Sequence, residues 1–225
     1  MTLLEGEIAI THRLVDASNA TLLGEIDGVG RVIYKPIAGE RPLWDFPDGT
    51  LADREVAAYK LSDWAGFHVV PTTVLREGPY GPGMVQIWIE TDPGIDLIEF
   101  GQRDDGQLRG LALFDAIINN TDRKFGHLLV DSEGKLFGCD HGVTFHSADK
   151  LRTVLWQFAG EPFTEDEKTI LRDLLGRFED LRSLLDEHLT IFEIEALKSR
   201  SERLTMAGQF PYPSDEWPSV PWPPV

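Results

Sequence analysis

Residues 119–142 read NNTDRKFGHLLVDSEGKLFGCDHG, a polar loop followed by two short apolar runs on either side of a turn. The two runs predict a β-hairpin. If Glu133-Gly134 forms a two-residue turn, His127 faces Asp140 at the open end of the ladder. Opposed residues lie about 4.5–5.5 Å apart. The pattern therefore predicts that His127 and Asp140 converge, with Asp122 of the entering loop close to them.

An imidazole and two carboxylates around one point are suitable ligands for a hard or borderline divalent metal ion. A lone aspartate at a strand end is more often a cap or a turn residue. The metal prediction therefore depends on the hairpin bringing His127, Asp140 and Asp122 together.

The residues before the loop predict a sheet with a single helix. Strands are expected over residues 20–26, 29–35, 69–75 and 84–90, and a helix capped by Thr50 over residues 50–64. Lys35 ends a strand that follows the turn at Asp27-Gly28, and Glu55 lies on the helix. A strand lysine paired with a helix glutamate can hold nucleotide phosphates over a glycine-containing turn. The alternative is that Lys35 is an ordinary lysine at the sheet edge and that Glu55 lies on a solvated helix face.

The residues after the loop are mainly helical. Helices are expected over residues 108–119 and 191–204, and a long apolar stripe follows a capping box formed by Thr164 and Glu167. The last segment, QFPYPSDEWPSVPWPPV, is too rich in proline for a helix or a central strand. It is either a disordered end or an extended tail whose tryptophans pack across the body.

These parts follow one another in the order found in a bilobal kinase. The sequence resembles the phosphoinositide 3-/4-kinase-like superfamily, and more closely a compact actinobacterial family of phosphatidylinositol-kinase-like proteins. The blocks that carry the resemblance are YKPIAGERPLWDFPDGTLADRE, GPYGPGMVQIW, NNTDRKFGHLLV and CDHG. The resemblance implies an α+β, bilobal kinase-like fold in one domain. Its parts would be an antiparallel-sheet lobe with one helix (1–92), a mainly helical lobe (93–207) and a Pro/Trp-rich tail (208–225).

The resemblance also implies a nucleotide site. Lys35 would contact the nucleotide phosphates, and Glu55 would orient Lys35. The strand that ends the first lobe would hold adenine through the backbone of Gln86, Ile87 and Trp88.

In the second lobe the resemblance implies the catalytic and metal-binding groups. Asp122 matches the aspartate that positions or deprotonates the acceptor hydroxyl, and Arg123 matches the arginine of the superfamily's Asp-Arg-His motif. Asp140 matches the metal-binding aspartate of Asp-Phe-Gly.

The chain departs from the family pattern at two positions. His127 replaces the catalytic-loop asparagine, and His141 replaces the phenylalanine of Asp-Phe-Gly. His127 and Asp140 are the expected ligands of Mg²⁺ or Mn²⁺. An imidazole ligand suits Mn²⁺ better than Mg²⁺. Alternatively Asn119 or Asn120 supplies the missing amide. Lys124 and His141 are minor candidates for the same site.

The segment RPLWDFPDG (41–49) follows the phosphate-binding lysine and has no counterpart in ordinary protein kinases. Trp44 and Phe46 make it a candidate lid over the nucleotide. A packed surface loop is the equal alternative.

Charge and composition restrict the partners. The chain of 225 residues has 21 Lys+Arg against 38 Asp+Glu, a net charge of −17. Nucleic-acid binding is not expected, because phosphate neutralisation needs clustered cations, and an anionic membrane surface would repel the chain. No apolar run reaches the 18 residues or so of a membrane span, and no basic start suggests a signal peptide, so a cytoplasmic location is expected. One cysteine, Cys139, excludes an internal disulfide and a Cys-rich zinc site.

The function predicted is an ATP-binding phosphotransferase that depends on Mg²⁺ or Mn²⁺. Its acceptor is expected to be a protein or a small polar hydroxyl compound rather than a lipid. The first alternative is a nucleotide-binding pseudokinase that acts as a regulatory module. A metal-binding protein or hydrolase that uses Asp122, His127, Asp140 and His146 without nucleotide is the third. The sequence leaves the oligomeric state open.

Overall fold

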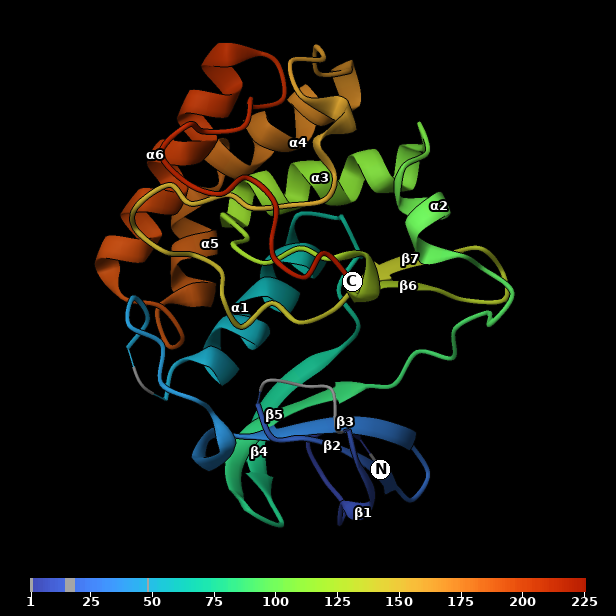
Figure 1. The fold of residues 1–225 in the computed structure, drawn as a ribbon. Coiled ribbons are helices and arrows are strands. Elements are labelled where there is room, and N and C mark those ends of the chain that lie inside the picture. The colour runs from blue at the N-terminus through green and yellow to red at the C-terminus, as the bar shows by residue number, and fades with distance from the viewer. Residues whose placement is uncertain (1, 15–18, 48) are drawn as a thin grey trace.

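The computed structural model describes residues 2–14, 19–47 and 49–225. It has an antiparallel sheet in its N-terminal part and helices in its C-terminal part, with helix α1 (Leu51–Trp64) between them (Figure 1). The predicted α+β class, with a sheet in the first part and a mainly helical second part, is confirmed.

The sheet has five antiparallel strands in the order β1-β2-β3-β5-β4. They are β1 (Ala9–Leu14), β2 (Thr21–Ile26), β3 (Gly30–Pro36), β4 (Thr73–Gly78) and β5 (Gly81–Ile87). Strand β1 was not predicted, because it is an edge strand with mostly exposed residues and no apolar alternation. Strand β4 begins later than expected, since Pro71 cannot donate to a ladder. Val69 and Val70 instead join the core of the helical part.

Helix α1 begins as predicted, but its cap comes from elsewhere. The carboxylate of Glu40 accepts hydrogen bonds from the backbone N–H of Leu51 at 3.2 Å and of Ala52 at 2.9 Å. The expected cap, Thr50, has a helical backbone (φ −112°, ψ −1°), whereas capping residues are extended. Its hydroxyl donates to the carbonyl of Pro47 instead. The Thr50 cap was therefore a wrong prediction.

Helix α1 packs against both parts of the molecule. Ala52 and Val56 contact Met84 of β5, whereas Ala57 and Leu61 belong to the core of the helical part. Burial on two sides fixes the helix, and with it Glu55, relative to the sheet and to the helices.

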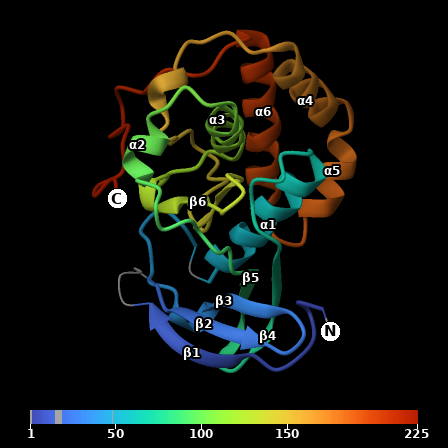
Figure 2. The same cartoon turned by 90° about the vertical axis from the view of Figure 1, so that its right-hand side faces the viewer.

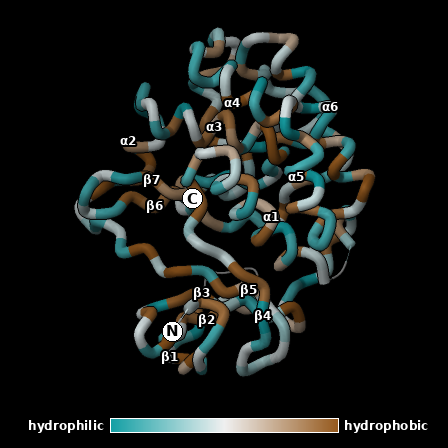
Figure 3. Tube along the Cα trace, turned by 180° about the vertical axis from the view of Figure 1, so that it is seen from behind, coloured by the Kyte–Doolittle hydropathy of each residue, from teal (hydrophilic) through white to brown (hydrophobic). Residues whose placement is uncertain are grey.

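The helical part is built around α3, which is seen end-on in Figure 2. Its helices are α2 (Leu97–Gly101), α3 (Gly106–Ile118), α4 (Glu165–Gly176), α5 (Phe178–Leu185) and α6 (Ile191–Ala207). In Figure 3 hydrophobic residues gather along α3 and in the sheet. The capping box of Thr164 and Glu167 is confirmed, while the apolar stripe behind it is divided into two helices at Arg177. Among the helices of the described residues, none combines the length and apolar composition needed to cross a bilayer.

The predicted hairpin is present with a different register. Strands β6 (Leu128–Val130) and β7 (Leu136–Gly138) pair Leu128 with Gly138, one residue away from the register in which His127 faces Asp140. The turn is longer by one residue, because the carboxylate of Asp131 accepts from the backbone of Glu133 and Lys135. Gly134 supports this turn with φ +79°.

The proline-rich tail packs across the helical part, as one of its two interpretations predicted, but of its two tryptophans Trp217 contacts the body whereas Trp222 is 90% exposed. The carbonyl of Ser219 accepts from the Thr153 N–H at 3.0 Å and from Trp156 Nε1 at 2.8 Å. The carbonyl of Pro224 accepts from the N–H of Phe125 at 2.9 Å. The C-terminus therefore lies beside the loop that precedes β6 (Figures 1 and 2).

Candidate functional site

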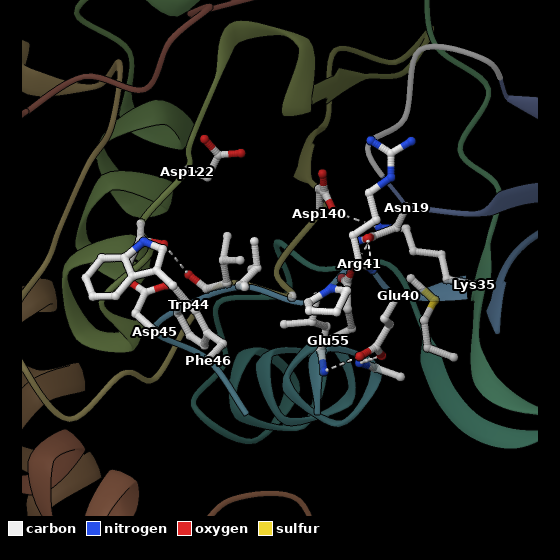
Figure 4. Close-up of a pocket in the computed structure, with 18 of the residues that line it drawn as sticks. Asn19, Lys35, Glu40, Arg41, Trp44, Asp45, Phe46, Glu55, Asp122 and Asp140 are labelled. Atoms are coloured by element: carbon white, nitrogen blue, oxygen red, sulfur yellow. Dashed lines mark hydrogen bonds and ion pairs between the residues drawn. The ribbon is translucent and has the colours of Figure 1, made fainter. Parts of the chain in front are cut away.

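A pocket of about 440 Å³ lies between the sheet, α1 and the helical part. Figure 4 shows Lys35 and Glu55 on one side and the segment Trp44–Phe46 on the other, with Asp122 and Asp140 above them. Most of the residues predicted for phosphate binding, catalysis and the lid therefore lie around one cavity.

Lys35 at the end of β3 is the centre of a charged triad. Its Nζ lies 2.7 Å from Glu55 Oε1 and 2.7 Å from Asp140 Oδ1. Although burial opposes it, the charges of Asp140 and Glu55 raise the pKa of Lys35 above its usual value. Lys35 in turn holds the pKa of Asp140 well below its usual range. Lys35 and Asp140 are therefore both charged at neutral pH.

The backbone conformation of Asp140 turns its carboxylate toward Lys35. Asp140 has φ +60°, in the left-handed region that non-glycine residues rarely adopt and that occurs at functional sites. The next N–H, that of His141, donates to Glu55 Oε2 at 2.9 Å. Glu55 therefore contacts both Lys35 and the backbone next to Asp140. In this way one residue of α1 fixes the distance between Lys35 of the first lobe and Asp140 of the second.

His127 lies next to Asp140 in spite of the changed register. Its Nε2 is 3.5 Å from Asp140 Oδ2, because both residues lie beyond the paired strands. Burial lowers the pKa of His127 to about 4, so the imidazole is neutral at pH 7 and able to bind a metal ion. Asp122 does not join His127 and Asp140 to complete the predicted set of three metal ligands. Within the described residues no three His, Cys, Asp or Glu side chains gather closely enough to hold a metal by themselves.

Asp122 lines the pocket from the loop after α3. Its N–H donates to the Oδ1 of Asn120 at 3.0 Å, and Lys124 Nζ lies 3.3 Å from its carboxylate. Burial raises the pKa of Asp122, which Lys124 partly opposes. A carboxylate held in this way can accept a proton from a hydroxyl group in the pocket.

Arg123 is fully buried and faces away from the pocket. Its Nε and Nη2 bind both oxygens of Asp115 at 2.9 Å, and Nη1 donates to the carbonyl of Cys139 at 2.9 Å. Nη2 also lies 2.7 Å from His141 Nε2. Arg123 therefore joins the Asp122 loop to the segment that carries Asp140.

Asp115 of α3 was missed by sequence reasoning, although it is a carboxylate within the apolar run LALFDAII. Its Oδ1 also accepts from Asn120 Nδ2 at 2.9 Å. Asn119 uses its amide on the carbonyls of His146 and Ala148. Both asparagines are fully buried, and neither lines the pocket. His141 is also fully buried, so its imidazole serves the network around Arg123.

Two expectations for the nucleotide site differ from the geometry. The N–H of Ile87 donates to Thr72, that of Trp88 donates to Arg31, and the Gln86 side chain bonds Thr73. These residues are not on the pocket wall, where β5 contributes Met84. The glycine turn of β2 and β3 lies at the opposite end of β3 from Lys35. The start of β2 lies at the Lys35 end of β3, and Asn19, shortly before β2, lines the pocket.

The loop with Trp44 and Phe46 borders the pocket and contacts the second lobe. Asp45 Oδ2 lies 2.8 Å from Lys150 Nζ. The ring of Trp44 and that of Trp217 in the tail each lie 4.9 Å from the same Nζ. Phe46 is buried under Arg54, while Trp44 stays 84% exposed. Sequence reasoning missed Lys150 and Trp217, which no local motif marks.

Solved structures of kinases have a similar overall fold. The fold resembles the Helicobacter pylori proinflammatory kinase CtkA with a TM-score of 0.56 and 13% identity, over 91% of this chain and 93% of that one. It resembles the Golgi casein kinase with a TM-score of 0.57 and 13% identity, over 91% of this chain and 72% of that one. A structure of that kinase with Mn/ADP bound gives a TM-score of 0.57 and 12% identity, over 91% and 73%.

These likenesses show a protein-kinase-like fold, and they do not specifically support the phosphoinositide-kinase branch. No protein-family model matches the chain. In sequence, the chain is 38% identical to Protein Rv2133c of Mycobacterium tuberculosis (strain ATCC 25618 / H37Rv) over 263 aligned residues, which cover 98% of this chain and 93% of that protein. The chain therefore belongs to the family of Protein Rv2133c, and it has a protein-kinase-like fold.

Proposed function

We propose that the protein is an ATP-dependent phosphotransferase that works with Mg²⁺ or Mn²⁺. The observation that carries the proposal is the triad of Lys35, Glu55 and Asp140, with the Asp122 carboxylate on the same pocket. Phosphoryl transfer needs charge neutralisation and positioning more than covalent chemistry. A fixed cation, a metal-binding carboxylate and a carboxylate able to act as a base are the groups that this chemistry uses.

The donor set around Asp140 fits a divalent metal ion that is also bound by nucleotide phosphates. Mg²⁺ usually takes only one or two carboxylates from the protein and completes its shell with phosphates and water. Asp140 and neutral His127 would supply the protein ligands, and imidazole favours Mn²⁺. The bound ion would neutralise charge on the transferred phosphate. Lys35 would hold phosphate oxygens while Glu55 keeps its ammonium group in place.

The first test is metal-dependent ATP binding, measured by thermal unfolding of the wild type and Asp140→Asn. ATP at 100 times its Kd stabilises the folded state by about 2.7 kcal/mol. For a chain of this size that raises Tm by about 5 to 10 °C. The shift is expected to need Mg²⁺ or Mn²⁺ and to be lost in Asp140→Asn. Asparagine keeps the size of the side chain and tolerates the positive φ, so a folded variant with an unchanged ATP shift would refute the metal role of Asp140.

A pseudokinase is the second candidate, because His127 takes the place of the catalytic-loop asparagine expected from the sequence resemblance, and its imidazole lies 3.5 Å from Asp140. Such a protein would bind nucleotide as a regulatory module and release no ADP. ADP release by the wild type above that of Asp140→Asn separates the two functions. Binding without turnover would establish the pseudokinase.

The acceptor is proposed to be a protein or a small polar hydroxyl compound. A chain with net charge −17 is repelled by a surface of anionic phosphoinositides. The basic residues that line the pocket are partly neutralised, as Lys150 is by Asp45. Transfer of phosphate to phosphatidylinositol in vesicles would overturn this ranking.

The Trp44 loop is proposed to cover the bound nucleotide. Trp44→Ala removes an aromatic ring at the pocket edge and its contact with Lys150. Stacking of the Trp44 ring on the adenine would contribute about 0.5–1.5 kcal/mol, so a rise of about two- to tenfold in the Kd for ATP is expected by titration calorimetry. Trp222→Ala is the matched control, because Trp222 is 90% exposed and does not line the pocket. An equal affinity of Trp44→Ala and Trp222→Ala would contradict the lid.

A further inference from the structure

A second cavity, of about 480 Å³, lies between α6, the tail and the segment 149–156. One extended segment separates it from the candidate active pocket. Lys150 and Arg152 line the active pocket, whereas the alternate residues Asp149 and Leu151 line the second cavity. The second cavity is therefore a distinct site that shares a wall with the first.

The walls of this cavity are mainly apolar. They are formed by Leu151, Trp156, Leu204, Phe210, Pro211 and Tyr212. The volume lies within the range of pockets that enclose small organic molecules. Apolar walls of this size favour a ligand with an aliphatic or aromatic body.

A buried cation stands on the wall of the cavity. Arg200 of α6 is 6% exposed, and its Nε donates to the carbonyl of Ile117 at 2.9 Å. Its Nη1 lies 3.2 Å from Asp149 Oδ1. The Nη2 atom has no hydrogen-bond partner among the described residues. The guanidinium therefore lines the cavity with one donor unused among the described residues.

The charge of Arg200 is only partly compensated. Asp149 also pairs with Arg203, so one carboxylate serves two guanidinium groups. Burial lowers the pKa of Arg200 to about 10 in spite of Asp149. The other acid on the wall, Glu216, is exposed on the tail. A buried cation with an unused donor favours the entry of an anionic group.

We propose that this cavity binds a small carboxylate with an apolar body. The carboxylate pairs with Arg200, and the body packs against Trp156, Leu204 and Tyr212. The proposal does not depend on the phosphotransferase activity, because it concerns a site on the other side of the shared wall.

The test uses octanoate and 2-naphthoate as probes on the full chain, with octanamide and 2-naphthamide as neutral counterparts. Titration calorimetry is expected to show binding of at least one acid. Its amide is expected to bind at least about tenfold more weakly, because only the acid offers a charge to the guanidinium. Equal affinity of acid and amide, or no binding of either acid, would overturn the proposal.

Two variants locate the site. Arg200→Lys is expected to weaken the acid at least about tenfold, because a lysine lacks the planar fork of the guanidinium. Ala207→Phe fills the cavity from an exposed position of α6, so it tests the site without removing a buried contact. It is expected to weaken the acid by a similar factor. Met206→Phe is the matched control, since Met206 is exposed and does not line the cavity. Wild-type affinity in Ala207→Phe would refute the assignment.

Discussion

Asp122→Asn is expected to lower phosphoryl transfer from ATP by about 10²–10⁴-fold, the usual contribution of a general base. The loss follows from the geometry of the pocket. Asp122 lines the pocket outside the triad, and its ion-pair partner is Lys124 instead of Lys35. Its burial raises its pKa, which makes it a better proton acceptor than a solvated aspartate.

The same variant is expected to bind ATP as the wild type does. Asparagine keeps the shape of the side chain, and the backbone bond from residue 122 to Asn120 is unaffected. Lys35→Met, in contrast, removes the cation that Glu55 and Asp140 share and should lose both transfer and the ATP-dependent rise in Tm. The pair of variants therefore separates the chemical step from nucleotide binding.

Transfer is measured as labelled phosphate incorporated into the protein itself, together with ADP release. Asp173→Asn is the matched control, because it is the same substitution at an exposed position of α4. Full transfer by Asp122→Asn would remove this residue from catalysis. Loss of ATP binding in Asp122→Asn would show that its role is structural.

The parts of the fold that follow from local pattern could be predicted from the sequence. The turn at Asp27-Gly28, helix α1, helix α3 and the capping box at Thr164 depend on residues close together in the chain. The pairing of Lys35 with Glu55 was also accessible, because a strand end and the next helix leave few arrangements.

Most of the rest depends on contacts between distant residues. The hairpin register differs from the predicted one because the side chain of Asp131 stabilises a longer turn than the Glu133-Gly134 pair suggests. Glu40 caps α1 from more than ten residues upstream, which no capping motif encodes. Lys150 reaches the pocket from the segment that follows β7, and Trp217 reaches it from the tail. The contacts of Glu40, Lys150 and Trp217 are tertiary, whereas Asp131 acts locally, through bonds to residues two and four positions away.

Asp115→Ala is expected to reduce the free energy of unfolding by about 3–5 kcal/mol, the cost of leaving a buried charge without its partner. Asp115 and Arg123 are both fully buried and joined by two hydrogen bonds of 2.9 Å. Removing the carboxylate also leaves Asn120 Nδ2 without its acceptor. Urea unfolding measures the change. Glu99→Ala is the control, because that glutamate forms an exposed i,i+4 pair with Arg103, and such pairs contribute about 0.3–0.5 kcal/mol.

The double variant Asp115→Leu/Arg123→Met tests the cause of the loss. If the cost comes from an uncompensated charge, removing both charges should restore part of the stability that Asp115→Leu alone loses. The restored protein should still be impaired in transfer, because Arg123 also holds the carbonyl of Cys139 next to Asp140. The contribution of this ion pair to stability would then be distinguished from its contribution to phosphoryl transfer. A double variant as unstable as Asp115→Leu would instead assign the loss to packing around α3, and the buried charge would not be its cause.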